Sequence, residues 1–579
     1  MFTDDKNAQI VLALLKKYNI KKIVVSPGTT NVPISRSVQI DSFFEAYSVV
    51  DERSAAYFAT GLAFESGEPV VISCTGSTAS RNYLPALTEA YYRNLPIIAL
   101  TSQRPVSDYG SLQPQSIDRT ISQADVKRLS VNLPVIRDKE DEKACILSVN
   151  KALTLATRKG GGPVHINLPL NTLSFTATDL PGIPKIDYYQ TDDLFCDDCI
   201  SQLRNLLYGK KVVLLIGSHR KFSLKEIETI EEFITIYNVT VFYDNTSNYY
   251  GKNRALSAVL SGLRRIDIKP EIVIDIGSVT PVYSMPNFLK GVDMWRISED
   301  GEFHQRCFGN LRKQFDCLEY TFFKTLANGQ AKASENEYYN TVMEKIGKVI
   351  VPDLPFSNIF VASILAQKLP ESCSLHMGAS ESVSNMNFFE LKKSVNSIGN
   401  VGTMGIDGAL STLVGQSMAD RNRLYFGLVG DLTFFYDMNI LGNRHITNNI
   451  RLLLVNNGRG IRFRIIADVE KPFGNENDEF IAAAGHYGSA EGWGRSMGFE
   501  YLTASNKDEF LVLIDDFCSQ DINKYSKPVL FEVFTTVEDE QKGWKLIRRA
   551  NKPVETALKD VAKQVLPTKA VNVLKKLRK

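Results

Sequence analysis

Two polar side chains follow strand-like segments in the last third of the chain. An apolar segment at 424–429 is followed by Asp431, and another at 451–455 is followed by Asn457. Because the carboxyl ends of parallel strands meet at one edge of a sheet, we expect both side chains at that edge. Carboxylate, amide and carbonyl oxygens are ligands that Mg²⁺ accepts when phosphates fill its other positions. The alternative is an ordinary strand–helix–strand unit, with Asp431 as a helix N-cap and Asn457 in a turn.

A third candidate lies near the N-terminus. Glu52 follows the strand-like segment 46–50 and opens the helical segment 53–65. An acidic residue there is favourable to the helix dipole, which is the structural explanation.

The elements that must position these residues alternate along the chain. Short β-branched runs alternate with longer helical patterns, which is typical of parallel α/β sheets. We predict an α/β fold with three parallel-sheet domains at 1–180, 190–340 and 350–540, followed by a basic helical tail at 541–579.

Composition narrows the class of protein. With 44% hydrophobic and 23% charged residues, the chain is that of a packed globular protein. No apolar run approaches the ~18 residues of a membrane helix. The first residues lack a basic-then-apolar signal, so we expect a cytoplasmic protein.

Charge is distributed unevenly along the chain. The net charge is +2, yet residues 541–579 hold twelve Lys and Arg against two acidic residues. The rest of the chain is therefore acidic, which argues against nucleic acid as a partner. The sequence of the tail favours either weak contact with an anionic membrane surface or packing against the rest of the protein.

The spacing of the candidate ligands resembles a known motif. Asp431 and Asn457, 26 residues apart and each beside a glycine, resemble the diphosphate- and Mg²⁺-binding motif of thiamine diphosphate (ThDP) enzymes. Segment 51–63 resembles the part of those enzymes that carries the cofactor-activating glutamate. Together with further segments, it most resembles the 2-succinyl-5-enolpyruvyl-6-hydroxy-3-cyclohexene-1-carboxylate synthase family, the carboligases of the menaquinone pathway. In chain order these further segments are 26–28, 75–79, 100–105, 115–118, 162–167, 405–408 and 430–439.

The resemblance implies two cofactors, ThDP and Mg²⁺, and a homodimer or homotetramer with ThDP bridging two subunits. The first domain would bind the pyrimidine, where Glu52 would activate the cofactor. Asp431, Asn457 and the backbone carbonyl of Arg459 would bind Mg²⁺. A bulky apolar side chain would hold the cofactor bent, with Ile406 preferred and Met404 the rival. The remaining implied cofactor contacts are Ser380, Gly430, Leu432 and Thr433.

The substrate arginines of that family are largely missing. Thr29-Thr30, Ser384 and Val401 stand where the family has arginine, and Tyr283-Ser284 matches a basic pair less certainly. Since a hydrogen bond to a charged group contributes about 1.5–3 kcal/mol, these losses would weaken binding of carboxylate-rich substrates.

Several polar groups remain for a substrate. Arg104 and Gln115 match the family and predict one binding site for the carboxylate of the 2-oxo acid. The segment after the metal motif contains three arginines, Arg459, Arg462 and Arg464. They predict either a new anion site, with Arg462 as its substrate contact, or a basic surface loop. His376 and His486 are expected in loops near the cleft, as proton relays or as structural residues.

We therefore expect a ThDP- and Mg²⁺-dependent decarboxylase or carboligase, a lyase or transferase. It would decarboxylate a 2-oxo acid and pass the acyl-anion equivalent to an acceptor, or protonate it, on substrates other than those of the menaquinone pathway. The alternatives are the authentic synthase and a catalytically silent binding or regulatory subunit.

Overall fold

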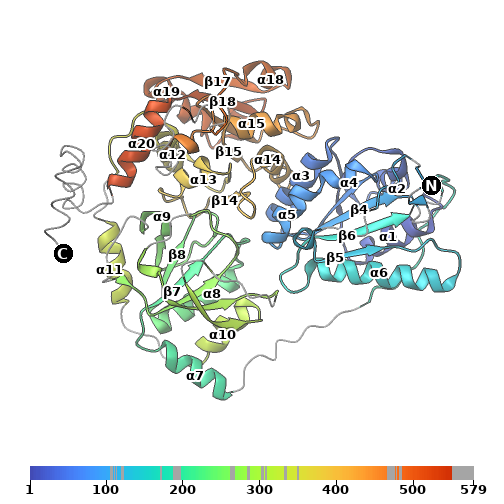
Figure 1. The fold of residues 1–579 in the computed structure, drawn as a ribbon, viewed down its shortest axis with the longest axis horizontal. Coiled ribbons are helices and arrows are strands. Elements are labelled where there is room, and N and C mark those ends of the chain that lie inside the picture. Colours follow the sequence, from blue (N-terminus) through green and yellow to red (C-terminus); the bar gives the residue numbers. More distant parts are fainter. Residues whose placement is uncertain are drawn as a thin grey trace.

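The structure is a computed structural model. It contains three sheets, and helices flank each of them (Figure 1). Each sheet has six strands, and all strand pairings among the described residues are parallel. This arrangement confirms the predicted fold class. The described residues are 1–104, 108–109, 111–112, 114–118, 123–169, 172–186, 197–260, 268–282, 287–300, 306, 309–330, 336–347, 351–465, 476, 479–481 and 485–550.

The first sheet has the strand order β2-β1-β3-β4-β6-β5. Its strands are β1 (Lys22–Val25), β2 (Glu45–Ser48), β3 (Val70–Cys74), β4 (Ile97–Gln103), β5 (Leu129–Asn132) and β6 (Val164–Pro169). Its helices are α1 (Lys6–Lys17), η1 (Thr29–Asn31), α2 (Val32–Ile40), α3 (Glu52–Ser66), α4 (Thr78–Asn82), α5 (Leu84–Tyr92), η3 (Ala124–Val126) and α6 (Lys139–Thr157).

The middle sheet has the order β12-β11-β10-β7-β8-β9. Its strands are β7 (Val212–Ile216), β8 (Thr240–Tyr243), β9 (Arg254–Leu256), β10 (Ile272–Ile276), β11 (Asp293–Ile297) and β12 (Asn310–Phe315). Its helices are α7 (Asp197–Leu207), α8 (Leu224–Tyr237), α9 (Ser257–Leu260), η5 (Asn287–Leu289), α10 (Glu319–Ala327) and α11 (Glu337–Ile346).

The third sheet has the order β14-β13-β15-β16-β18-β17. Its strands are β13 (Ser374–Met377), β14 (Asn396–Gly399), β15 (Tyr425–Gly430), β16 (Ile450–Asn456), β17 (Glu500–Ala504) and β18 (Val529–Phe534). Its helices are α12 (Asn358–Lys368), α13 (Glu381–Met386), α14 (Ala409–Ser417), α15 (Asp431–Asp437), η6 (Met438–Gly442), α16 (Arg462–Ile465), α18 (Glu491–Ser496), α19 (Lys507–Phe517), η8 (Ile522–Lys524) and α20 (Val537–Ala550).

The central strands are apolar because helices cover both faces of each sheet. Every residue of β3, β7 and β16 is buried, as expected for parallel strands that meet no solvent. The predicted domain boundaries at 180–190 and 340–350 include residues outside the described ranges, and they stay predictions, whereas position 541 lies inside helix α20.

The tail prediction needs a correction over residues 541–550. Helix α20 packs its apolar face onto the third domain, where Ile547 is buried and Trp544 and Leu546 contact the core. This face is therefore not available to a lipid surface, and the alternative of packing on the body holds here. Residues 551–579 lie outside the described residues. Among the described residues, no helix is long and apolar enough to cross a membrane.

The first and third domains meet where α3 crosses α14. A Cβ atom added to Gly61 would lie 2.0 Å from the backbone oxygen of Thr412, and one added to Gly415 would lie 1.9 Å from that of Phe58. The two backbones are thus in direct contact, which only glycine permits. Figure 1 shows α3 and α14 facing each other between the two sheets.

One carboxylate joins all three domains beside this crossing. Glu65, near the C-terminal end of α3, lies 2.6 Å from the Lys221 ammonium of the middle domain. In the third domain it lies 2.9 Å from Arg423 and accepts a 3.1 Å hydrogen bond from the Ser374 hydroxyl. The two cations offset the burial of the carboxylate.

Gly61→Ala is expected to destabilise the protein by about 1–3 kcal/mol, because the added methyl group overlaps a backbone oxygen that cannot move without shifting α14. Urea unfolding followed by tryptophan fluorescence measures the loss. Gly492→Ala in α18 is the matched control, since a Cβ atom there meets nothing within 4 Å. Equal stability of Gly61→Ala and the wild type would contradict the close crossing.

Candidate active site

The carboxyl ends of three adjacent strands form one edge of the third sheet. Strands β13, β15 and β16 are neighbours in that order. Ser380 and Glu381 follow β13, Asp431 follows β15, and Asn457 follows β16. The edge therefore brings together the residues that the sequence predicts for the diphosphate and the metal.

Asp431 is held by backbone groups of the β16 turn. One carboxylate oxygen accepts from the N–H of Leu432 at 2.7 Å. The other accepts from Gly458 at 2.7 Å and from Asn457 at 3.2 Å. Burial raises the pKa of this carboxyl group. A bound divalent cation would reverse that effect, because it favours the charged carboxylate.

Asn457 contributes a buried oxygen without a donor. Its side-chain Oδ1 has no hydrogen-bond partner among the described residues. Leaving such an acceptor unsatisfied costs about 1–3 kcal/mol. Beside it, a Cβ atom added to Gly430 would meet nothing within 4 Å, so the backbone there borders open space. An oxygen-seeking cation such as Mg²⁺ fits this donor set of carboxylate, amide and carbonyl oxygens.

The two histidines differ in position. His486 lies at this edge, with its Nε2 3.2 Å from an Asp431 oxygen but not aligned for a hydrogen bond, while its Nδ1 accepts from the Gly488 N–H. His376 corrects our expectation of a loop position, because it lies within β13 and is fully buried. Burial lowers its pKa to about 3, and its Nδ1 contacts the Gln416 side chain at 3.1 Å. His376 is therefore a core residue.

Four non-glycine residues at the candidate motifs have left-handed backbones. They are Ser77, Gln115, Ser380 and Met404, with φ between 55° and 68°. This conformation costs roughly 1–2 kcal/mol for a residue with a Cβ atom. Such strain concentrates where a backbone is shaped for a ligand.

Met404 and Ile406 have different surroundings. Met404 is half-buried and packs against the third-domain core. Ile406 is also half-buried, but it belongs to none of the hydrophobic clusters formed by the described residues. Ile406 is therefore the side chain of this turn that remains available to a ligand.

Glu52 does not cap its helix. The Asp51 side chain performs that task by accepting from the N–H groups of Arg53 and Ser54. The Glu52 carboxylate is partly exposed and makes no hydrogen bond or ion pair with the described residues. It is left available for chemistry.

Within one chain, Glu52 and Asp431 lie at opposite ends of α15. Ser54, two residues after Glu52, contacts Asp437 at the C-terminal end of α15, whereas Asp431 begins that helix. Seven helical residues span about 10 Å at ~1.5 Å each. The structure brings Asp431 and Asn457 together but keeps Glu52 apart from them.

The predicted substrate residues fall into two places. Arg104 donates from Nε to the Pro114 carbonyl at 3.1 Å, so it lies beside the turn that carries Gln115. Arg462 begins α16 and pairs with Glu381 at 2.6 Å, its guanidinium lying over the Trp544 ring. Sequence reasoning missed Glu381, although its position just after β13 is a signal of the kind used for Asp431.

No cation stands at the described positions of the missing arginines. Val401 is buried in the third-domain core. The Ser384 hydroxyl is buried without a hydrogen-bond partner among the described residues. The Thr30 hydroxyl pairs with that of Thr75. Tyr283-Ser284 lies outside the described residues.

A second buried carboxyl group lies behind the edge. Glu540 on α20 accepts on one oxygen from the Asn358 N–H at 2.9 Å and from the Thr535 hydroxyl at 2.7 Å. Burial, helped by the charges of Glu381 and Asp431, raises its pKa to about 8. Helix α20 thereby places a buried carboxyl group near the site, and the raised pKa of that group favours its neutral, protonated form.

Comparison with known proteins places these observations in a family. Residues 5–125 match the family described as "Thiamine pyrophosphate enzyme, N-terminal TPP binding domain". A 2-succinyl-5-enolpyruvyl-6-hydroxy-3-cyclohexene-1-carboxylate synthase from Phocaeicola vulgatus is 32% identical over 558 residues, covering 95% of this chain and 98% of the relative. The same enzyme from Bacteroides thetaiotaomicron is 32% identical, covering 92% of this chain and 97% of the relative.

A solved structure shares the fold. The thiamine diphosphate-dependent 4-hydroxybenzoylformate decarboxylase of Rhodococcus jostii RHA1 superposes with a TM-score of 0.69 over 92% of this chain and 99% of that chain. At 15% sequence identity this likeness shows the fold alone.

Glu540→Gln is expected to flatten the pH dependence of stability. The folded protein keeps a proton on Glu540 that the unfolded chain releases above pH ~4.5, so this contribution is full below that pH and is lost as pH rises through about 8. Gln keeps the accepting oxygen but does not titrate. Between about pH 5 and pH 9 its melting temperature should fall less than that of the wild type, by roughly 2–4 °C per kcal/mol.

Glu538→Gln is the control for this experiment, because Glu538 lies exposed on the same helix. Its melting curve should track the wild type at every pH. Parallel curves for Glu540→Gln and the wild type would contradict the raised pKa.

Proposed function

The chain belongs to the 2-succinyl-5-enolpyruvyl-6-hydroxy-3-cyclohexene-1-carboxylate synthase family of thiamine diphosphate-dependent enzymes, and from this premise we propose that it decarboxylates a 2-oxo acid and transfers the acyl-anion equivalent to an acceptor, with Mg²⁺ as a second cofactor. The observation that carries the proposal is the unsatisfied Asn457 oxygen beside Asp431 at the edge of the third sheet. When bound, ThDP supplies an electron sink for the negative charge left when CO₂ departs.

The third domain holds the metal and the diphosphate. Asp431, Asn457 and the Arg459 carbonyl would hold Mg²⁺, which would supply positive charge to offset that of the diphosphate. Gly430 lets the diphosphate approach the backbone, since nothing fills the space beside it. The remaining contacts come from Ser380, Leu432 and Thr433.

The first domain supplies the proton chemistry. Glu52 hydrogen-bonds the pyrimidine ring and exchanges a proton at its carboxyl oxygen. Ile406 supports the bent cofactor, because Met404 is committed to the core. Because α15 separates Glu52 from Asp431 within one chain, Glu52 works with the partner subunit's Asp431 in a homo-oligomer.

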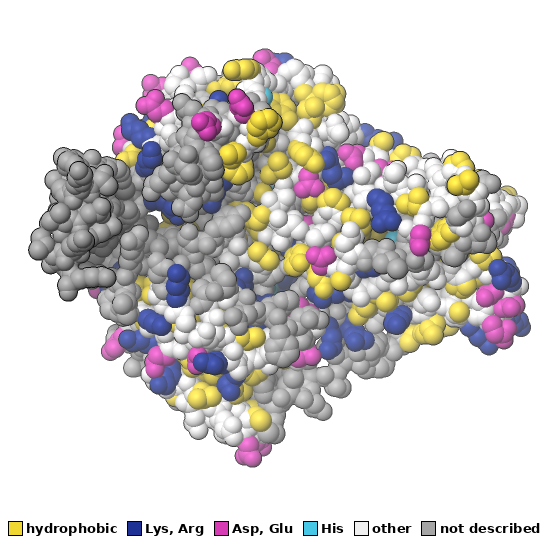
Figure 2. Space-filling view, viewed as in Figure 1, with side chains coloured by type: hydrophobic (Ala, Val, Ile, Leu, Met, Phe, Trp, Pro, Cys, Tyr) yellow, Lys and Arg dark blue, Asp and Glu magenta, His cyan; other side chains and the backbone are white. Residues whose placement is uncertain are grey.

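Exposed apolar side chains near Glu52 support a subunit contact there. Val50, two residues before Glu52, is 73% exposed. Tyr436 is 54% exposed, and its carbonyl accepts a hydrogen bond from Arg53. Large apolar side chains exposed together are typical of surfaces that another protein covers. On the face drawn in Figure 2, hydrophobic side chains are scattered among acidic and basic ones across the described surface.

The substrates are proposed to differ from those of the menaquinone pathway. Arg104 and the Gln115 turn lie together and bind the carboxylate of the 2-oxo acid. Arg462, paired with Glu381, faces the acceptor. Val401 and Ser384 offer no charge to a second or third carboxylate, which disfavours an acceptor such as isochorismate.

The authentic synthase is the second candidate. Identity of 32% across 558 residues to the Phocaeicola vulgatus synthase favours it. Under this candidate, Arg104, Arg459, Arg462 or Arg464 would replace the missing arginines.

A panel of 2-oxo acids separates the two candidates. With ThDP and Mg²⁺, we expect the protein to release CO₂ from a small acid such as pyruvate and not from 2-oxoglutarate, because the described site lacks a clamp for a second carboxylate. Trapping the CO₂ measures the release. Release from 2-oxoglutarate alone, increased by isochorismate, would overturn this choice and establish the synthase activity.

Glu52→Gln is expected to lower the rate of CO₂ release by ~10²–10⁴-fold, because the amide cannot exchange the proton. Rates are measured at saturating ThDP so that cofactor affinity does not enter. Asp51→Asn is the matched control, since asparagine still caps α3 and should leave the rate near that of the wild type. A near-normal rate in Glu52→Gln would refute the assigned role.

A further inference from the structure

We propose that Glu89, together with Arg93, is a positioning residue that shapes the turn 399–408 and thereby presents Ile406 to the cofactor. This inference rests on the proposed function, because it concerns how the same site is held. Both residues lie on the first domain, whereas the turn belongs to the third domain of the same chain.

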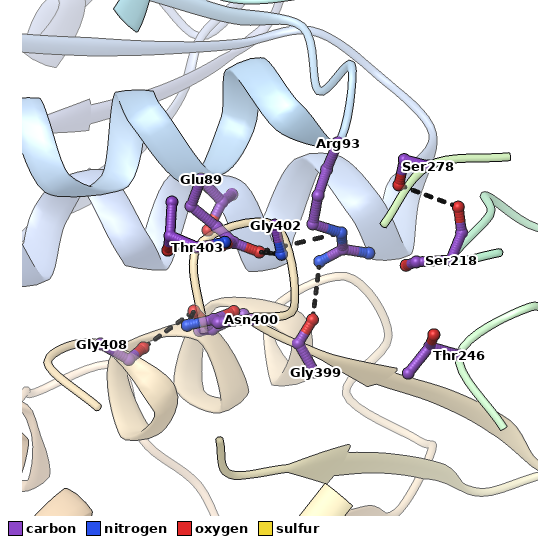
Figure 3. Close-up of polar contacts among 12 residues, drawn as sticks. Glu89, Arg93, Ser218, Thr246, Ser278, Gly399, Asn400, Gly402, Thr403 and Gly408 are labelled. Atoms are coloured by element: carbon purple, nitrogen blue, oxygen red, sulfur yellow. Dashed lines mark hydrogen bonds and ion pairs between the residues drawn. The ribbon is translucent and has the colours of Figure 1, made fainter. Parts of the chain in front are cut away.

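Glu89 binds the turn with both carboxylate oxygens. The side chain is fully buried on α5. One oxygen accepts from the Gly402 N–H at 3.1 Å, and the other accepts from the N–H and the hydroxyl of Thr403 at 2.7 and 2.8 Å. Figure 3 shows the carboxylate reaching into the loop from the helix above it.

Arg93 contacts the start of the same turn. It lies one helical turn after Glu89, with its Nε 4.0 Å from the carboxylate. Its guanidinium donates to the Gly399 carbonyl at 3.2 Å, as drawn in Figure 3. The pair therefore contacts both the start of the turn at Gly399 and its middle at Thr403, while its two charges offset each other.

The turn is pressed closely against α5. A Cβ atom added to Gly402 would lie 3.0 Å from a Glu89 oxygen and 3.1 Å from the Tyr92 Cβ. Two residues later, Met404 has the left-handed backbone described above. The contacts with α5 thus coincide with a conformation that a free chain rarely adopts.

The first domain also contacts the C-terminal end of the turn, at residues 407–408. The Tyr57 hydroxyl on α3 donates to Asp407 at 3.2 Å, and the Tyr57 ring fills the space beside Gly408. Ile406 lies between these anchors and the Glu89 contacts. The chain's own first domain therefore fixes the third-domain half of the site, independently of Glu52.

Stability alone does not account for this arrangement. Burying an ion pair costs desolvation energy that its attraction often fails to repay, whereas fixing one conformation is a recognised use of such pairs. Glu65 provides a comparison, because it is also a buried carboxylate joining the first and third domains but contacts Arg423 and Ser374 rather than the turn.

The test is the double variant Glu89→Gln/Arg93→Met, which removes both charges and leaves no uncompensated cation. We expect a melting temperature closer to the wild type than that of Glu89→Gln alone, but ThDP affinity about tenfold weaker. The near-ultraviolet circular dichroism of the bound cofactor should change as well, because it depends on the asymmetric surroundings that the turn provides. Titration calorimetry with ThDP and Mg²⁺ measures the affinity.

Glu65→Gln is the matched control and should lower the melting temperature while leaving ThDP affinity and the dichroism unchanged. Wild-type affinity and dichroism in the double variant would overturn the role of Glu89. Absence of ThDP binding by the wild type would be a different result, since it would overturn the proposed function and this inference with it.

Discussion

The direct backbone contact between α3 and α14 is the constraint on which the candidate site depends. Gly61 and Gly415 remove the side chains that would otherwise separate the two helices. Glu52 begins α3, and the turn bearing Ile406 leads into α14. Because the helices cannot slide without a clash, their crossing fixes where each domain places its share of the site. The same crossing explains why a single chain holds Glu52 away from Asp431.

Buried carboxylates help to fix the positions of the domains relative to one another around this contact. Glu65 joins the middle domain to the other two, Glu89 holds the turn before α14, and Asp437 accepts from the N–H and the hydroxyl of Ser411. Burial raises the pKa of Asp437 to about 7, which marks how costly its charge is in that place. The contacts that Glu65 and Glu89 make across domains form only in one arrangement of the domains. Apolar packing alone would tolerate several.

The sequence predicted the parts of the fold that local pattern determines. Inner strands such as β15 and β16 are mostly apolar, and their bounds agree with the expected segments 424–429 and 451–455 within a residue. Several strands were not predicted because they are short or polar; among them, β13 contains His376, and β14 reads Asn-Ser-Ile-Gly. Asp431 and Asn457 could be paired from sequence because strand ends of one sheet share an edge. Glu89 and Glu540 could not, since their roles arise from tertiary contacts.

The groups that we propose for the cofactor and the acceptor contact that we propose at Arg462 occupy different parts of the structure, and this separation bears on selectivity. The groups that serve the cofactor come from strand ends and from α3, which the core fixes. Arg462, which we propose faces the acceptor, begins α16 and is already paired with the buried Glu381 of α13 at 2.6 Å. A substrate carboxylate would have to compete with that acid and would be repelled by it. A hydroxyl group, in contrast, can donate to Glu381 and accept from Arg462 without charge cost. Selectivity can therefore change at α13 and α16 while the cofactor chemistry stays as the core places it.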